Sequence, residues 1–175
     1  MNELNIKEIF CETLSGFIAF ITCLLLLDFT KYFDLNIFLI LFDVTLPNII
    51  FIAIISYFIG LIIDAIGLSV GEIFLDNIFA TENTPTTIDY KIFNKKVTEH
   101  ILKYRDDQWT YYSLYRNIFI IMTIALPFYS IKIFKTFDIL MSFILIFIYL
   151  LILCSLLYAS RTLINMYYNI TKNID

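Results

Sequence analysis

The sequence ILMSFILIFIYLLILCSLLYAS, residues 139–160, decides the class of fold of this protein. It contains 22 residues without a charge, between Asp138 and Arg161. A helix of about 20 mostly apolar residues is long enough to cross the hydrocarbon core of a bilayer. We therefore expect residues 137–161 to form a transmembrane helix.

The rest of the chain, 175 residues in all, has the same apolar character. Hydrophobic residues make up 60% of it and charged residues 16%, and its mean hydropathy is +0.82. Soluble domains have roughly 45–50% apolar and about 25% charged residues. The composition therefore excludes an ordinary soluble domain and a disordered chain. The formal charge of −4 gives no support for nucleic-acid binding.

Three further apolar stretches predict transmembrane helices, at about 9–30, 44–71 and 112–133. The first and third have charge-free runs shorter than a full span, so we expect their helices to extend outward on both sides. Together with the helix at 137–161, they predict one all-α domain over residues 1–175. We expect this domain to be an integral membrane bundle of four transmembrane helices, with a cytoplasmic segment at about 72–111.

The distribution of basic residues predicts the orientation of the chain. Lys and Arg in short loops stay on the cytoplasmic side of a membrane. Both termini and the central loop carry nine of them, and the opposite side carries three. We therefore expect both termini and the central loop to be cytoplasmic, in the inner (cytoplasmic) membrane of a bacterial cell. The nine residues are Lys7, Lys91, Lys95, Lys96, Lys103, Arg105, Arg116, Arg161 and Lys172.

The central loop contains one predicted amphipathic helix. Thr86 is followed three residues later by Asp89, which matches a capping box at a helix start. Apolar side chains then recur every three or four residues from Phe93 to Tyr104, and basic side chains cover the other faces. We expect this cytoplasmic helix to bind a partner protein. Its predicted partner-binding residues are Lys91, Phe93, Lys95, Lys96, Val97, His100, Ile101, Lys103, Tyr104 and Arg105.

Small residues share one face of the predicted helix 44–71. At about 100° per residue they fall within an arc of about 60°. Helices in lipid associate through small residues because these let the two backbones approach closely. This face contacts either another helix of the same chain or another subunit, in a homo-oligomer or along a pore. It consists of Ala53, Ser56, Gly60, Gly67 and Gly71.

One carboxylate, Asp64, lies beside this small-residue face. A charged side chain inside a membrane is costly and usually pairs with another polar group. Two interpretations follow from its position. Asp64 marks the cytoplasmic end of its helix, or it forms an intramembrane polar pair with Arg116 of the next helix.

Patterns typical of catalysis or of metal binding do not occur in the sequence. The three cysteines, Cys11, Cys23 and Cys154, lack the spacing of metal ligands, and His100 is the single histidine. No catalytic triad and no phosphate-binding loop is recognisable. We therefore expect a protein that is not an enzyme and that needs no cofactor and no metal.

These observations predict a non-enzymatic multi-pass membrane protein, a self-associating subunit that docks a cytoplasmic partner. A homo-oligomeric ion channel or pore-forming effector is one alternative. A small transporter or a bacteriocin-immunity protein is another. In the number and size of its predicted helices, the chain resembles the small four-helix membrane subunits of bacterial anti-phage systems such as Kiwa. This resemblance implies a role in phage defence.

Overall fold

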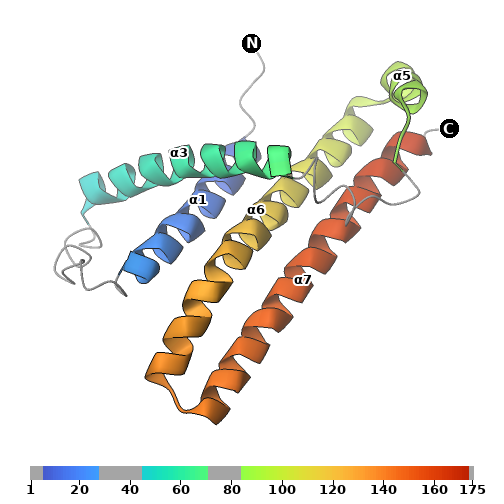
Figure 1. The fold of residues 1–175 in the computed structure, drawn as a ribbon. Coiled ribbons are helices and arrows are strands. Elements are labelled where there is room, and N and C mark those ends of the chain that lie inside the picture. Colours follow the sequence, from blue (N-terminus) through green and yellow to red (C-terminus); the bar gives the residue numbers. More distant parts are fainter. Residues whose placement is uncertain (1–5, 28–44, 71–83, 174–175) are drawn as a thin grey trace.

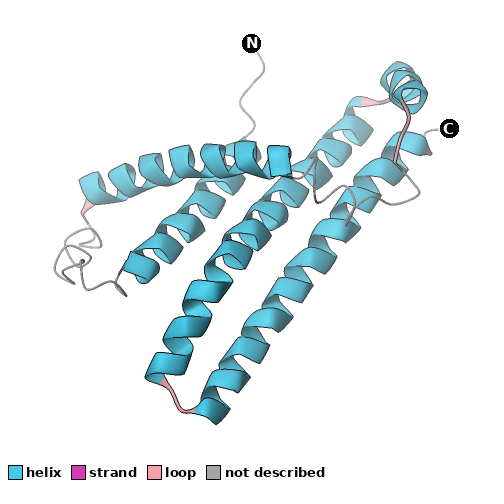
Figure 2. Ribbon diagram, viewed as in Figure 1, coloured by secondary structure: helices cyan, strands magenta, loops and turns pink. Residues whose placement is uncertain are grey.

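The computed structural model describes residues 6–27, 45–70 and 84–173 of the chain. Within these residues the secondary structure is helical and contains no strand (Figure 2), which confirms the predicted all-α class. Gly71 and the predicted helix end at 28–30 lie outside the described residues. The five described helices are α1 (Ile6–Leu27), α3 (Leu46–Val70), α5 (Thr87–Lys96), α6 (Glu99–Thr136) and α7 (Ile139–Lys172).

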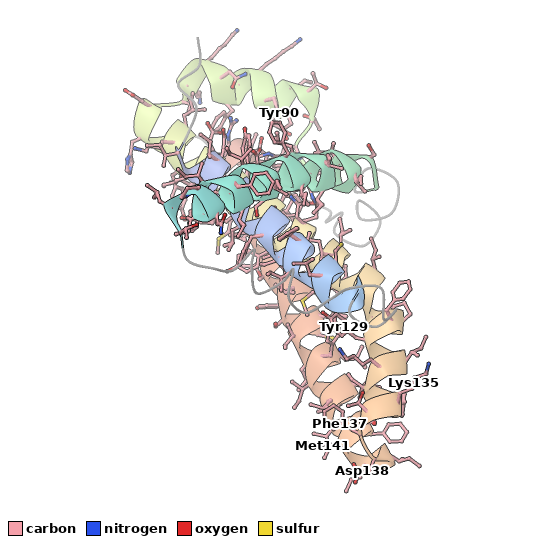
Figure 3. All side chains as sticks on the ribbon, turned by 90° about the vertical axis from the view of Figure 1, so that its left-hand side faces the viewer. Tyr90, Tyr129, Lys135, Phe137, Asp138 and Met141 are labelled. Carbon is pink, nitrogen blue, oxygen red and sulfur yellow. The ribbon has the colours of Figure 1, made fainter. Side chains whose placement is uncertain are left out.

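Helices α6 and α7 form a long antiparallel hairpin (Figure 1). A short turn at Phe137 and Asp138 joins them, and the Asp138 side chain caps α7 by accepting a hydrogen bond from the backbone N–H of Met141 at 3.1 Å. Tyr149 Oη donates to the carbonyl oxygen of Met122 at 2.8 Å. Figure 3 places the turn at one end of the molecule and α5 at the other. The hairpin therefore sets the long dimension of the structure.

Helix α6 extends far beyond the predicted span at 112–133. It has 38 residues, and its first half contains most of its charged side chains. A charge-free stretch of sequence predicts only the part of a helix that can lie in lipid. The helix itself can continue through charged residues, because many of these have good helix propensity. The predicted third span thus covers only the later part of α6.

Helix α1 lies beside α6, and α3 runs across both of them (Figures 1 and 3). The crossing of α1 and α3 depends on two glycines. A Cβ atom on Gly16 would lie 1.7 Å from the backbone oxygen of Ser56, and one on Gly60 would lie 2.0 Å from that of Glu12. Real Cβ atoms do not approach other atoms so closely, so only glycine allows the two backbones to meet here.

Three described helices are long and apolar enough to cross a membrane, namely α3, α6 and α7. Within the described residues, helix α1 is not among them. The oblique path of α3 also differs from that of a helix in a parallel bundle. The four-helix transmembrane bundle therefore stays a prediction.

The predicted amphipathic helix of the central loop is divided in two in the structure. The capping box at its start is confirmed, since the backbone N–H of Thr86 donates to Asp89 Oδ2 at 2.7 Å and the backbone N–H of Asp89 donates to Thr86 Oγ1 at 3.3 Å. The first bond holds the pKa of the Asp89 carboxyl below its usual value. The chain then leaves the helix at Val97 and Thr98, two β-branched residues in extended conformation. This break lets α5 fold back toward α7.

Candidate functional site

The two residues of the predicted polar pair meet where α3 contacts α6. Arg116 Nη2 donates to Asp64 Oδ1 at 2.7 Å. Two neighbours on α6 donate to the same oxygen, the hydroxyl of Ser113 and the amide nitrogen of Asn117, the latter at 3.1 Å. The Arg116 side chain is only 2% exposed and that of Asp64 is 24% exposed. A buried guanidinium thus has a carboxylate as its charged partner, which we call the Asp64–Arg116 centre.

Gly67 provides the space that this centre occupies. A Cβ atom on Gly67 would lie 2.8 Å from Asn117 Oδ1 and 3.0 Å from Arg116 Nε. The guanidinium carbon of Arg116 also lies 5.4 Å from the centre of the Tyr112 ring, which is a cation–π distance. The glycine of one helix and the aromatic ring of another therefore hold the charged pair in one position.

The small-residue face of α3 is divided between two neighbours. Ser56 and Gly60 are buried against α1, Gly67 is buried against the centre, and Ala53 is exposed. Gly71 lies outside the described residues. The buried members of this face thus contact other helices of the same chain, which is one of the two interpretations that the sequence left open.

Sequence reasoning missed Gly16, the residue that meets Ser56 and Gly60. A signal for it was present, because small side chains recur every four residues on α1. The residues of this series are all buried in the structure. A spacing of four places them on one helix face, next to Gly16. The series consists of Cys11, Ser15 and Ala19.

A polar pocket of about 100 Å³ opens beside the Asp64–Arg116 centre, between α1, α3 and α6. Three carboxylates line it, and Arg116 balances the charge of one of them. Within the described residues, no group of His, Cys, Asp or Glu side chains has an arrangement that could hold a metal ion. The pocket is lined by Glu8, Cys11, Glu12, Asp64, Trp109, Thr110, Ser113, Leu114 and Asn117.

A second polar arrangement holds α5 against the hairpin. The guanidinium carbon of Arg105 lies 4.4 Å from the centre of the Phe93 ring and 5.3 Å from that of Tyr167. Phe93 is fully buried. Burial and the neighbouring Tyr167 hydroxyl raise the pKa of Tyr90 to about 12. An arginine between two rings therefore connects α5, α6 and α7, and we call α5 in this position the α5 cap.

The α5 cap changes the assignment of the predicted partner-binding residues. Phe93 faces inward, and Arg105 is largely covered, so neither of these two is available to a partner. Val97 and Ile101 are partly buried at the break between the helices. The periodicity predicted one continuous apolar face, but the break between α5 and α6 buries Phe93 beneath Arg105 and leaves Tyr104 exposed. The exposed predicted residues are Lys91, Lys95, Lys96, His100, Lys103 and Tyr104.

Replacing Phe93 with alanine should detach the α5 cap. The substitution removes a buried ring and the surface on which Arg105 stacks, and α5 has only 10 residues to hold it in place. We expect amide protection in α5 to fall by about 2 kcal/mol, because a short helix can open without unfolding the rest. Hydrogen exchange measured on the intact protein in detergent tests this. Tyr104→Ala, at an exposed position of α6, is the control and should leave α5 protected; equal loss in both variants would contradict the packing described.

Both arrangements connect helices that are distant in the sequence. The first pairs opposite charges in the interior, and the second fixes α5 at the end of the hairpin. Neither protein-family models, nor curated proteins, nor solved structures give a match to this chain.

Proposed function

We propose that this chain is a non-enzymatic multi-pass membrane protein whose α6–α7 hairpin presents the α5 cap in the cytoplasm as a docking platform for a partner protein. The observation that carries the proposal is the length of the apolar part of the hairpin. From the turn at Phe137 to Arg116, α6 rises about 32 Å, and from the turn to Arg161, α7 rises about 35 Å. The hydrocarbon core of a bilayer is about 30 Å thick.

The side chains on this part of the hairpin suit a lipid environment. Large apolar residues point outward from both helices. An apolar surface of this extent is unfavourable in water and is suited to lipid. Lys132 and Lys135 lie near the turn, where a lysine can extend its ammonium group to the headgroups. The exposed apolar residues include Ile124, Phe128, Ile131, Phe143, Phe147 and Leu151.

The polar part of the hairpin continues past the bilayer in this proposal. From Arg116 to Glu99, α6 rises about 26 Å further, and the headgroup layer on each side adds only about 5–8 Å to the core. The α5 cap at this end then stands in water, beyond the headgroups. The excess of basic residues in the central loop favours the cytoplasmic side.

Self-association and the pore or transporter alternatives stay predictions. The buried small residues of α3 pack within the chain, so they do not favour a pore along that face. A second copy would have to bind another surface, such as the outer side of α3, where Ile54, Phe58 and Ile62 are exposed. The span predicted from the first apolar stretch and the role in phage defence stay predictions as well.

Side-specific labelling of single cysteines tests the proposed function. The chain is prepared with Cys11, Cys23 and Cys154 replaced by serine, and one cysteine is placed at Lys95 or at Lys135. We expect a membrane-impermeant maleimide to label position 95 only in inverted vesicles and position 135 only in intact spheroplasts. Labelling of position 95 from outside the cell would overturn the proposal.

A further inference from the structure

The outer face of α5 combines apolar and basic side chains. Because Phe93 faces inward, the opposite side of this helix points away from the hairpin. Ile88 is 68% exposed and Ile92 is 44% exposed, and their spacing of four residues places them on one face. Lys91 and Lys95 lie along one edge of this face. Lys96 lies along the other edge, and all three lysines are exposed.

The positive charge of this face is not balanced by ion pairs with other described residues. Within residues 6–27, 45–70 and 84–173, no salt bridge involves Lys91, Lys95 or Lys96. Asp89 is the only acidic residue in α5, and its carboxylate accepts hydrogen bonds from Thr86 in the capping box. The whole chain, in contrast, has a formal charge of −4. A basic patch on an acidic protein attracts a partner of negative charge.

The position of the α5 cap distinguishes between two kinds of negative partner. If the hairpin crosses the bilayer as proposed above, Arg105, which packs against Phe93 of the cap, lies about 17 Å along α6 from Arg116. This is past the roughly 5–8 Å of headgroups, and the lysines lie on the far side of α5 from this contact. Electrostatic attraction to lipid decays over a Debye length of about 8 Å at physiological salt. The surface of the same membrane is therefore too far away to be the ligand of these lysines.

From these observations we infer that the outer face of α5 binds an acidic segment of a soluble protein, with apolar side chains of the segment against Ile88 and Ile92 and its carboxylates at Lys91, Lys95 and Lys96. This inference rests on the proposed function. It keeps Lys91, Lys95 and Lys96 from the predicted partner-binding residues and adds Ile88 and Ile92. It leaves out Phe93, which the α5 cap buries. One short helix offers a small contact area, so the interaction is transient and depends on salt concentration.

Binding of a designed peptide to the full chain tests this inference. The chain is reconstituted in nanodiscs of zwitterionic lipid, and the probe is a fluorescent helical peptide of glutamate and leucine. A peptide with lysine in place of each glutamate serves as the matched probe. We expect the acidic peptide to bind, the basic peptide not to bind, and the affinity for the acidic peptide to fall as salt is raised.

Two double variants and one control locate the binding surface. Lys91→Glu combined with Lys95→Glu should weaken binding by about tenfold or more, and Ile88→Ser combined with Ile92→Ser should also weaken it. Lys135→Glu introduces the same charge at the opposite end of the hairpin and should leave binding unchanged. Because all these side chains are exposed, hydrogen exchange in α5 should show that each variant keeps the α5 cap.

Several outcomes would overturn the inference. These are equal binding of both peptides, unchanged binding in the lysine variant, and lysine-dependent binding of anionic vesicles in place of the acidic peptide. The inference would also fail if the protein forms an oligomer, as measured by its mass, and if this oligomer dissociates in the lysine variant. The outer face of α5 would then bind a second copy of the chain. The cysteine labelling at position 95, described above, distinguishes a failure of this inference from a failure of the proposed function. If that position is cytoplasmic and no peptide binds, the inference fails and the proposed function does not.

Discussion

Gly60→Leu should separate α3 from α1, whereas Ala53→Leu on the same helix should leave them packed. At Gly60 even a Cβ atom would lie 2.0 Å from a backbone oxygen of α1, so a leucine has no space. Backbone cannot move aside as a flexible side chain can, and we expect a loss of more than about 4 kcal/mol in stability. Thermal unfolding in detergent, followed by circular dichroism, measures the effect.

Ala53→Leu is the matched control because it introduces the same side chain on the same predicted face. Ala53 is exposed in the structure, so the leucine should change stability by less than about 0.5 kcal/mol. Equal destabilisation by the two substitutions would contradict the crossing of α1 and α3. Gly16→Leu should reproduce the result from the other helix, since a Cβ atom there would lie 1.7 Å from the oxygen of Ser56.

Asp64→Ala should destabilise the protein by about 3–5 kcal/mol, because it leaves the guanidinium of Arg116 buried without a charged partner. The double variant Asp64→Ala with Arg116→Met should recover most of this loss, since it removes the charge along with its partner. A double-mutant cycle compares the unfolding of the wild type, Asp64→Ala, Arg116→Met and the double variant. It gives the coupling energy between the two residues.

Asp107→Ala is the control for the Asp64 experiment. Asp107 also pairs with a cation, Lys7, but the Lys7 side chain is 44% exposed. Water therefore solvates its ammonium group after the substitution, and the loss of stability should be much smaller than that of Asp64→Ala. If Asp64→Ala costs no more than Asp107→Ala, the Asp64–Arg116 centre is not buried as described.

The parts of the structure that sequence could predict depend on local properties. Charge-free stretches are read directly from the sequence, and the apolar parts of α3, α6 and α7 agree with those predicted. The pairing of Asp64 with Arg116 was one of two interpretations that the cost of a lone charge in an apolar helix allowed, and the two side chains form an ion pair in the structure. The capping box at Thr86 is equally local, because all its atoms lie within four residues.

The parts that sequence could not predict depend on contacts between helices. Periodicity shows that Phe93 and Tyr104 share the spacing of a helix face, but it does not reveal that α5 folds back and buries Phe93 against Arg105. The break at Val97 and Thr98 is favoured by two β-branched residues, yet helices often include such pairs when tertiary packing requires it. The oblique path of α3 follows from the contact between Gly16 of α1 and Gly60 of α3. The periodicity of a single helix cannot predict this contact, because it joins two helices.

The central claim is that the apolar parts of α6 and α7 each cross the bilayer once and that the polar part of the hairpin stands in water. The most direct test is the solvent accessibility of spin labels in the reconstituted protein, with single cysteines at Phe128, Phe147 and Tyr104, which are all exposed. We expect labels at 128 and 147 to be accessible to oxygen dissolved in lipid and protected from a water-soluble nickel complex. The label at 104 should show the reverse. A label at 147 that is open to the nickel complex, or one at 104 that is protected from it, would contradict the account.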